Sequence, residues 1–134
     1  MTTIASNLQA VRDSIMAAAT KAGRPASEIK LLAVSKTFAA DAIRETYHAG
    51  QRCFAESYIQ EAQGKINALQ DLPLEWHYIG PIQSNKTRVI AENFSWVHSV
   101  DRLKIAERLS DQRPDSMPPL QVCLQINISR EASK

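Results

Sequence analysis

A lysine, Lys36, lies at the end of an apolar run, where a positive charge is unusual. The run from Leu31 to Ser35, within the stretch LLAVSKT, is typical of a buried β-strand. Burying an unpaired ammonium is expensive, so this lysine is expected to reach solvent, to find a partner or to react. Because side chains alternate along a strand, Lys36 shares a face with Val34 and Leu32.

Two interpretations of Lys36 remain open from its position alone. If its face lines the mouth of a barrel, partial desolvation favours the neutral amine, which is the nucleophile that forms a Schiff base with an aldehyde. In the other interpretation, the side chain only extends from the strand end to keep its charge in water.

Polar side chains occur at or near the ends of the other predicted strands. Ser57 follows the run RCFAE, His77 lies within EWHYIG, Asn85 follows that run, and Asn127 belongs to the last strand. The carboxyl ends of parallel strands converge, so these groups are placed where a ligand would bind. Each also has a simpler explanation, such as a first-turn residue for Asn85 or a packed core histidine for His77.

The elements that position these residues alternate along the chain. An amphipathic helix over residues 4–22 is followed by strands at 31–35, 52–57, 75–80, 95–100 and 120–129, with helices at 39–50, 58–70, 84–94 and 101–112 between them. This order predicts parallel βαβ crossovers and the α/β class. A doubly wound sheet and a (β/α)8 barrel are both compatible with it, and a barrel needs eight strands in about 250 residues.

Length and composition narrow the function classes. The chain of 134 residues suits a single domain, with 44% hydrophobic and 22% charged residues. A net charge of +2 from scattered residues argues against nucleic-acid binding. Neither a leader nor an apolar run of membrane-spanning length is visible, so we expect no membrane contact and a cytoplasmic location.

The sequence lacks the motifs that are typical of several common classes of enzyme. No GxGxxG or GxxxxGK[ST] loop occurs, and there is no GxSxG elbow. The three histidines show no ligand spacing with cysteines or carboxylates, so we predict no metal site. Cys53 and Cys123 lie in strand-like runs, which favours free, buried thiols. A solvated helix face accounts for Glu61, and its distance from Glu56 gives no ground for an acid/base pair.

Five motifs together resemble a known family. The stretches LLAVSKT, FAESYIQEAQGKI, EWHYIGPIQSNKTR, SVDRLKIAERL and LQVCLQINISREASK, in this order and spacing, are similar to the pyridoxal phosphate homeostasis protein family, which is related to the N-terminal barrel of alanine racemases. The resemblance covers essentially the whole chain. HYIGPIQSNK together with the strand-end lysine is its most diagnostic part.

The resemblance implies a (β/α)8 barrel preceded by a helix, with pyridoxal 5′-phosphate (PLP) held as a Schiff base on Lys36. It also implies Ser57, His77, Asn85 and Asn127 as cofactor-pocket residues. A member of this family would have no established catalysis, would act in vitamin B6 and amino-acid homeostasis, and would deliver PLP to apo forms of PLP-dependent enzymes. We expect the full-length protein to be a monomer.

The sequence departs from the family pattern in two ways. The family usually has FGENY after the second strand, whereas this chain has Ala55 and Ser57 in FAESY, and Ser57 is shorter than the asparagine it replaces. Family members are also longer, so residues 1–134 are expected to be about five strands and a leading helix of one barrel domain, incomplete at the C-terminus. The phosphate-binding residues would lie beyond Lys134.

Two other functions remain as alternatives. One is a PLP-dependent fold-type III enzyme such as an amino-acid racemase, which needs acid/base groups on both faces of its substrate. Tyr58 and Tyr78 are the tyrosines near the predicted pocket, but their spacing favours neither. The other is a partner-binding module in which Lys36 has no chemical role.

Overall fold

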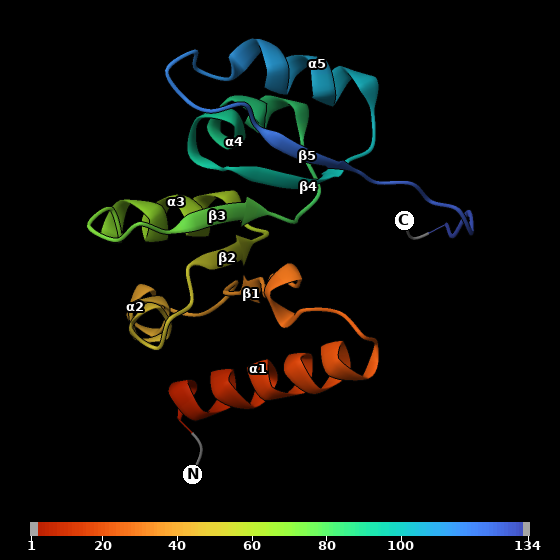
Figure 1. Cartoon of the computed structure of the whole chain (residues 1–134). Coiled ribbons are helices and arrows are strands. Elements are labelled where there is room, and N and C mark those ends of the chain that lie inside the picture. Colours follow the sequence, from red (N-terminus) through yellow and green to blue (C-terminus); the bar gives the residue numbers. More distant parts are fainter. Residues whose placement is uncertain (1–2, 133–134) are drawn as a thin grey trace.

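Five parallel strands form a single sheet, and they follow one another in the sheet in their order along the chain (Figure 1). The computed structural model describes residues 3–132. The strands are β1 (Ala33–Val34), β2 (Cys53–Glu56), β3 (Glu75–Tyr78), β4 (Trp96–Val100) and β5 (Gln121–Leu124). Because each neighbouring pair is parallel, the carboxyl ends of all five strands lie at the same edge of the sheet.

Helices alternate with these strands as predicted. The α-helices are α1 (Ile4–Lys21), α2 (Ala40–His48), α3 (Ile59–Ala68), α4 (Thr87–Asn93) and α5 (Leu103–Gln112), and short 3-10 helices occupy Ala26–Glu28 (η1) and Ser84–Lys86 (η2). The predicted α/β class, with five strands and a leading helix, is therefore confirmed. Helix α1 lies beside α2 (Figure 1).

Local sequence signals set the ends of the first two helices. Thr3 and Ser6 cap the start of α1 reciprocally, each side chain accepting the backbone N–H of the other residue. After α1, Gly23 has a φ of +68°, and after α2, Gly50 has a φ of +103°, both in the left-handed region that favours glycine. At Gly50 the guanidinium of Arg12 also packs closely and donates to the carbonyl of Ala49.

The core lies on the face of the sheet that the helices cover. Phe54 pairs in register with Trp76, and Tyr78 with Val97, so these four side chains share one face of β2, β3 and β4 in two successive rows. An irregularity between Val97 and Val100 changes the alternation in β4, and both valines are buried. The helices contribute Ile43, Ala62, Ile90, Ala91, Ile105 and Leu109 to this core, and Leu69, just after α3, adds to it.

The two outer strands differ from prediction. Strand β1 has two residues in place of the predicted five, and Val34 is half-exposed, because β1 pairs with β2 alone within residues 3–132. Strand β5 ends at Leu124, not near residue 129, and all its side chains are exposed because β4 is its one partner in the described chain. Both strands are therefore shorter than their apolar runs predicted. Within residues 3–132, no helix is long and apolar enough to cross a membrane.

The core predicts a large stability loss on truncation of Ile90. This α4 side chain is 0% exposed, so Ile90→Ala leaves a cavity and should lower the free energy of unfolding by about 2–5 kcal/mol. Met16→Ala, at an exposed position of α1, is the matched control and should change it by no more than about 0.5 kcal/mol. Urea unfolding measures both; equal losses would mean that the helix-covered face is not the core.

Candidate functional site

The turn that carries Lys36 follows β1 directly, at the carboxyl edge of the sheet. The N–H of Ser35 donates to the carbonyl of Ala55 in β2 at 2.9 Å, which extends the strand pairing to the residue before the lysine. Thr37, the residue after it, has a φ of +69°, unusual for a side chain branched at Cβ. Lys36 itself is exposed in the described structure.

A buried network of charges holds both neighbours of Lys36. The Nζ of Lys65, on α3, lies 3.0 and 3.1 Å from the two carboxylate oxygens of Glu56 and 2.7 Å from the carbonyl oxygen of Ser35. The hydroxyl of Ser35 donates to the same Glu56 carboxylate. On the other side of the lysine, the N–H of Thr37 donates to Glu61, which also pairs with Lys65 at 2.7 Å.

Burial makes this network costly to break. The side chains of Glu56 and Lys65 are 0% and 7% exposed, so neither charge can be hydrated if the other is removed. Lys65 donates to the Ser35 carbonyl, and Glu61, which pairs with Lys65, accepts the Thr37 N–H, so the network fixes the backbone on both sides of Lys36. The chain holds the lysine's backbone rigidly while its side chain stays in solvent.

The interpretation of Glu61 as part of a solvated helix face is wrong. Its side chain is about one third exposed and bonds to both Lys65 and the Thr37 backbone. These bonds, that with Lys65 foremost, hold the pKa of Glu61 below its ordinary value of 4.5. Glu61 is thus the part of the network that connects Lys65 to the residue after Lys36.

Ser57 follows β2 and has an unsatisfied hydroxyl. Its Oγ is buried and has no hydrogen-bond partner among the described residues. The loop after β3 approaches it closely, because a Cβ at Gly80 would lie only 2.5 Å from the Ser57 carbonyl oxygen. A hollow of about 430 Å³ opens beside it, lined by Ser57, Tyr58, Ile59, Gln60, Tyr78, Pro81, Gln83 and Lys86. A buried hydroxyl without a partner is a place where a ligand could bond.

The two tyrosines near Ser57 differ in their environments. Tyr78 is buried on the helix-covered face, and its hydroxyl donates to the carbonyl of Pro81 at 3.0 Å. Burial raises the pKa of Tyr78. Tyr58 is about half exposed. Tyr78 is therefore poorly placed to act as a base.

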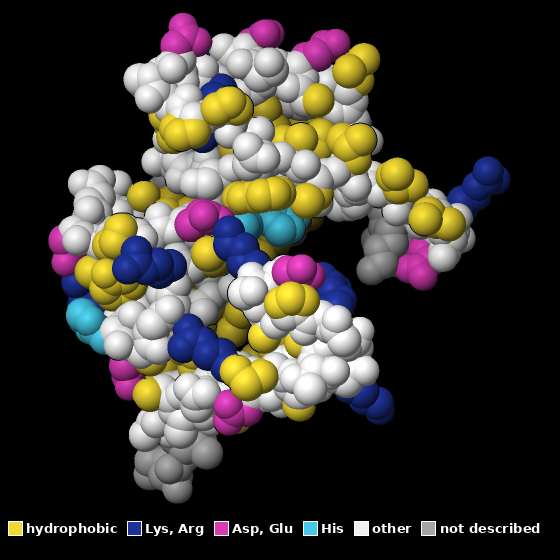
Figure 2. Space-filling model, in the orientation of Figure 1, with side chains coloured by type: hydrophobic (Ala, Val, Ile, Leu, Met, Phe, Trp, Pro, Cys, Tyr) yellow, Lys and Arg dark blue, Asp and Glu magenta, His cyan; other side chains and the backbone are white. Residues whose placement is uncertain are grey.

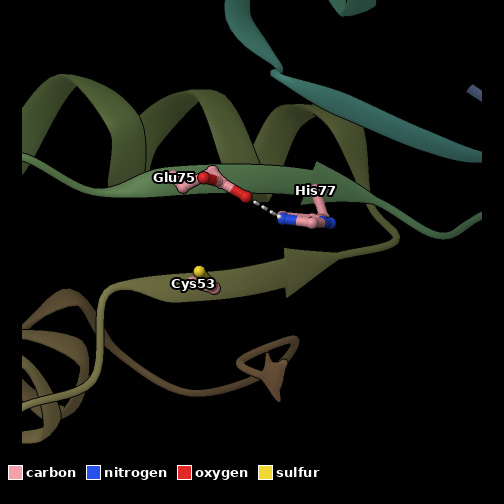
Figure 3. A group of neighbouring side chains, drawn as sticks. All are labelled: Cys53, Glu75 and His77. Atoms are coloured by element: carbon pink, nitrogen blue, oxygen red, sulfur yellow. Dashed lines mark hydrogen bonds and ion pairs between the residues drawn. The ribbon is translucent and has the colours of Figure 1, made fainter. Parts of the chain in front are cut away.

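His77 lies on the face of the sheet opposite the helices, and both of its ring nitrogens have partners. Its Nε2 is 2.7 Å from Glu75 Oε1, and its Nδ1 is 2.8 Å from His98 Nε2 (Figure 3). Burial lowers the pKa of His77, and the Glu75 carboxylate partly offsets this effect. Figure 2 shows histidine side chains in the hollow of this face, next to hydrophobic ones.

Two features of this part of the sheet did not follow from residue spacing. The histidines show no ligand spacing in the sequence, but Cys53, Glu75 and His77 place their ligand atoms within 4.8 Å of one another. Both cysteines are free, as predicted, but neither is buried: Cys53 is partly exposed and Cys123 is exposed. Strand pairing, which sequence spacing does not reveal, brings the three side chains together.

The two predicted asparagines lie farther along the same edge. Asn85 is exposed in η2, after β3. Asn127 follows β5, where its side chain bonds to the backbone of Glu131 at 2.8 and 3.1 Å and thereby closes a local turn. The structure brings Lys36 and Ser57 to adjacent strand ends, whereas Asn127 follows β5, which is separated from β1 by three strands.

Comparisons with known proteins agree on one family. Residues 6–131 match the family described as alanine racemase, N-terminal domain. The pyridoxal phosphate homeostasis protein of Pseudomonas aeruginosa is 63% identical over 134 residues, which is all of this chain and 58% of that protein. The chain thus spans little more than half the length of this curated relative.

Two solved structures of PipY are also similar to this chain. PipY of Synechococcus elongatus PCC7942, solved without PLP, superposes with a TM-score of 0.85 at 41% identity, over 98% of this chain and 57% of that one. PipY solved with PLP bound has a TM-score of 0.66 at 46% identity, over 82% of this chain and 48% of that one.

Sequence reasoning missed Lys65 as a site residue. The signal was weak but present: Glu56 shares its strand face with the core residue Phe54, so its carboxylate had to meet a cation inside the protein. Lys65 lies one helical turn after Glu61, on the buried side of α3 with Ala62.

Removing the ammonium of Lys65 should be strongly destabilising. Lys65→Met leaves the Glu56 carboxylate buried without its cation and should lower the free energy of unfolding by about 3–5 kcal/mol. Arg44→Met breaks the exposed pair between Arg44 and Asp71 and should cost about 0–1 kcal/mol. If chemical denaturation gives the two variants the same loss, the buried pair does not have the role assigned here.

Acid should weaken the network through Glu61. The folded state lowers the pKa of this carboxyl, so the unfolded chain takes up its proton at higher pH than the folded one. The stabilisation is complete above the ordinary pKa of 4.5 and is lost as the pH falls through the lower, folded value. Urea midpoints measured from neutral pH downward should therefore fall less steeply in Glu61→Gln than in the wild type. Parallel curves would contradict the role of Glu61.

Proposed function

The chain belongs to the family of alanine racemase N-terminal domains, and on this premise we propose that it binds PLP as a Schiff base on Lys36. The protein would hold and release the cofactor, and so take part in intracellular vitamin B6 and amino-acid homeostasis without a catalytic activity of its own. The observation that carries the proposal is the Lys36 turn, in which an exposed amine follows a strand end whose backbone is fixed on both sides.

The names of similar proteins support the choice of ligand. The relative from Pseudomonas aeruginosa is a pyridoxal phosphate homeostasis protein, and PipY has been solved with PLP bound. Because the chain spans 58% of the former, we propose that the described sheet is part of a larger (β/α)8 barrel and that phosphate-binding groups come from its remaining part.

The chemistry of imine formation suits Lys36. A neutral amine attacks the aldehyde carbon of PLP, a C=N bond forms, and the aldehyde oxygen leaves as water. The amine must be accessible, and Lys36 Nζ makes no hydrogen bond or ion pair with the described part of the chain. Lys65, although nearby, is excluded from this role because its ammonium is buried and has carboxylate partners.

The polar groups beside the lysine fit a ligand to different degrees. Ser57 has an unsatisfied buried hydroxyl and is the best second contact. Asn85 is exposed and stays a proposed pocket residue. His77 and Asn127 would first have to break existing bonds, to Glu75 and to the Glu131 backbone respectively. Lys36 and Ser57 are therefore the two main contacts of the proposed pocket.

We favour a carrier over a racemase. A racemase needs acid/base groups on both faces of its substrate, and Tyr78 is held on the helix-covered face by its bond to Pro81. The proposed partners are apo forms of PLP-dependent enzymes, which would receive the cofactor. The free thiols of Cys53 and Cys123 suit the reducing environment of the cytoplasm.

The visible absorbance of the protein titrated with PLP tests this function. The wild type should develop the imine band, and Lys36→Ala should lose it entirely because no amine remains at that position. Lys86→Ala is the matched control, since Lys86 lines the hollow beside Ser57, and it should keep the band. Unchanged far-ultraviolet circular dichroism would verify the fold. A full band in Lys36→Ala would refute the proposal, and racemisation of an added amino acid would refute the carrier role.

A further inference from the structure

We propose that Cys53, Glu75 and His77 form a binding site for a divalent transition-metal ion, with Zn²⁺ as the best match. The Sγ of Cys53, a carboxylate oxygen of Glu75 and a ring nitrogen of His77 all lie within 4.8 Å of one another. The three side chains point to the same side of β2 and β3 (Figure 3). This inference is independent of the function proposed for Lys36.

The pairing of β2 with β3 brings the three ligands together. Glu75 and His77 are two residues apart in β3 and therefore share a face, and Cys53 is the register partner of Glu75 in β2. The ligands lie on regular strands, so the backbone positions of all three are fixed by the sheet. This face is the one opposite the helix-covered core, and Cys53 and Glu75 are partly exposed on it.

The donor set determines the class of ion. A thiolate, an imidazole and a carboxylate suit Zn²⁺, which binds sulfur at about 2.3 Å and nitrogen or oxygen at about 2.0–2.2 Å. Ca²⁺ and Mg²⁺ prefer oxygen ligands and would not use the thiol or the ring. Three protein ligands leave a fourth tetrahedral position for water. On binding, the Cys53 thiol releases its proton to solvent and the sulfur donates its electron pair to the ion.

Two neighbours hold the His77 ring in a suitable orientation. The Trp96 ring stacks on it, with 5.7 Å between the two ring centroids and an interplanar angle of 1°. His98 Nε2 lies 2.8 Å from His77 Nδ1. When Nε2 of His77 binds an ion, Nδ1 carries the proton and can donate it in a hydrogen bond to His98. Metal-bound histidines usually have such a partner for their second nitrogen.

A lysine competes with the ion for one ligand. Lys30 Nζ lies 2.5 Å from Glu75 Oε1, the same oxygen that faces His77. The Lys30 side chain is about half exposed, so it can move into water when an ion takes its place. The lysine thus neutralises Glu75 without metal, and its removal should make the carboxylate more available to the ion.

Titration with Co²⁺, a spectroscopic substitute for Zn²⁺, tests the site in the purified protein. The wild type should bind one equivalent and show a thiolate-to-cobalt charge-transfer band, which Zn²⁺ then abolishes by displacement. Cys53→Ser should lose that band, whereas the control Cys123→Ser, at the exposed cysteine, should keep it. No band in the wild type, or a band that depends on Cys123, would overturn the proposal.

Two further variants test the surroundings of the ion, and neither removes a ligand. Lys30→Met should tighten Zn²⁺ binding in competition titrations, because the competing ammonium is gone. His98→Phe should weaken it by about 10- to 100-fold, the usual effect of losing a partner of a metal-bound histidine. Unchanged affinity in both variants would show that the ion lies elsewhere, even if Cys53→Ser failed to fold.

Discussion

The ammonium of Lys65 lies between the Glu56 carboxylate and the Ser35 carbonyl, and the geometry around Lys36 depends on this contact. Removing two charges from water costs several kcal/mol per ion, so the pair forms only because additional hydrogen bonds satisfy its remaining donors and acceptors. Those bonds come from Ser35 on one side of Lys36 and, through Glu61, from Thr37 on the other. The burial of one lysine thus positions another that stays in solvent.

The two faces of the sheet have different roles. The Glu56 and Lys65 pair belongs to the helix-covered side, where it joins the carboxyl end of β2 to α3 and to the turn after β1. The opposite face carries the Cys53, Glu75 and His77 cluster, nearer the amino ends of β2 and β3. A change at one of these sites is therefore separated from the other by the sheet, and the two can be altered independently.

The order of elements was predictable because hydrophobic periodicity and glycine signals are local. Gly50 ends α2 as expected, and Lys36 and Ser57 follow adjacent strands as expected. The side-chain partners were not predictable, because strand register and helix docking decide them. His77 meets His98 through the pairing of β3 with β4, and Lys65 meets Glu56 through the packing of α3. Neither contact follows from residue spacing alone.

We propose that the fixed turn after β1 presents Lys36 as the one lysine that bonds to PLP. Borohydride reduction of the PLP-loaded protein makes such a bond permanent, and peptide mass mapping then identifies the modified residue. We expect a single adduct, on Lys36. An adduct on Lys30 or Lys86, or one spread over several exposed lysines, would contradict it.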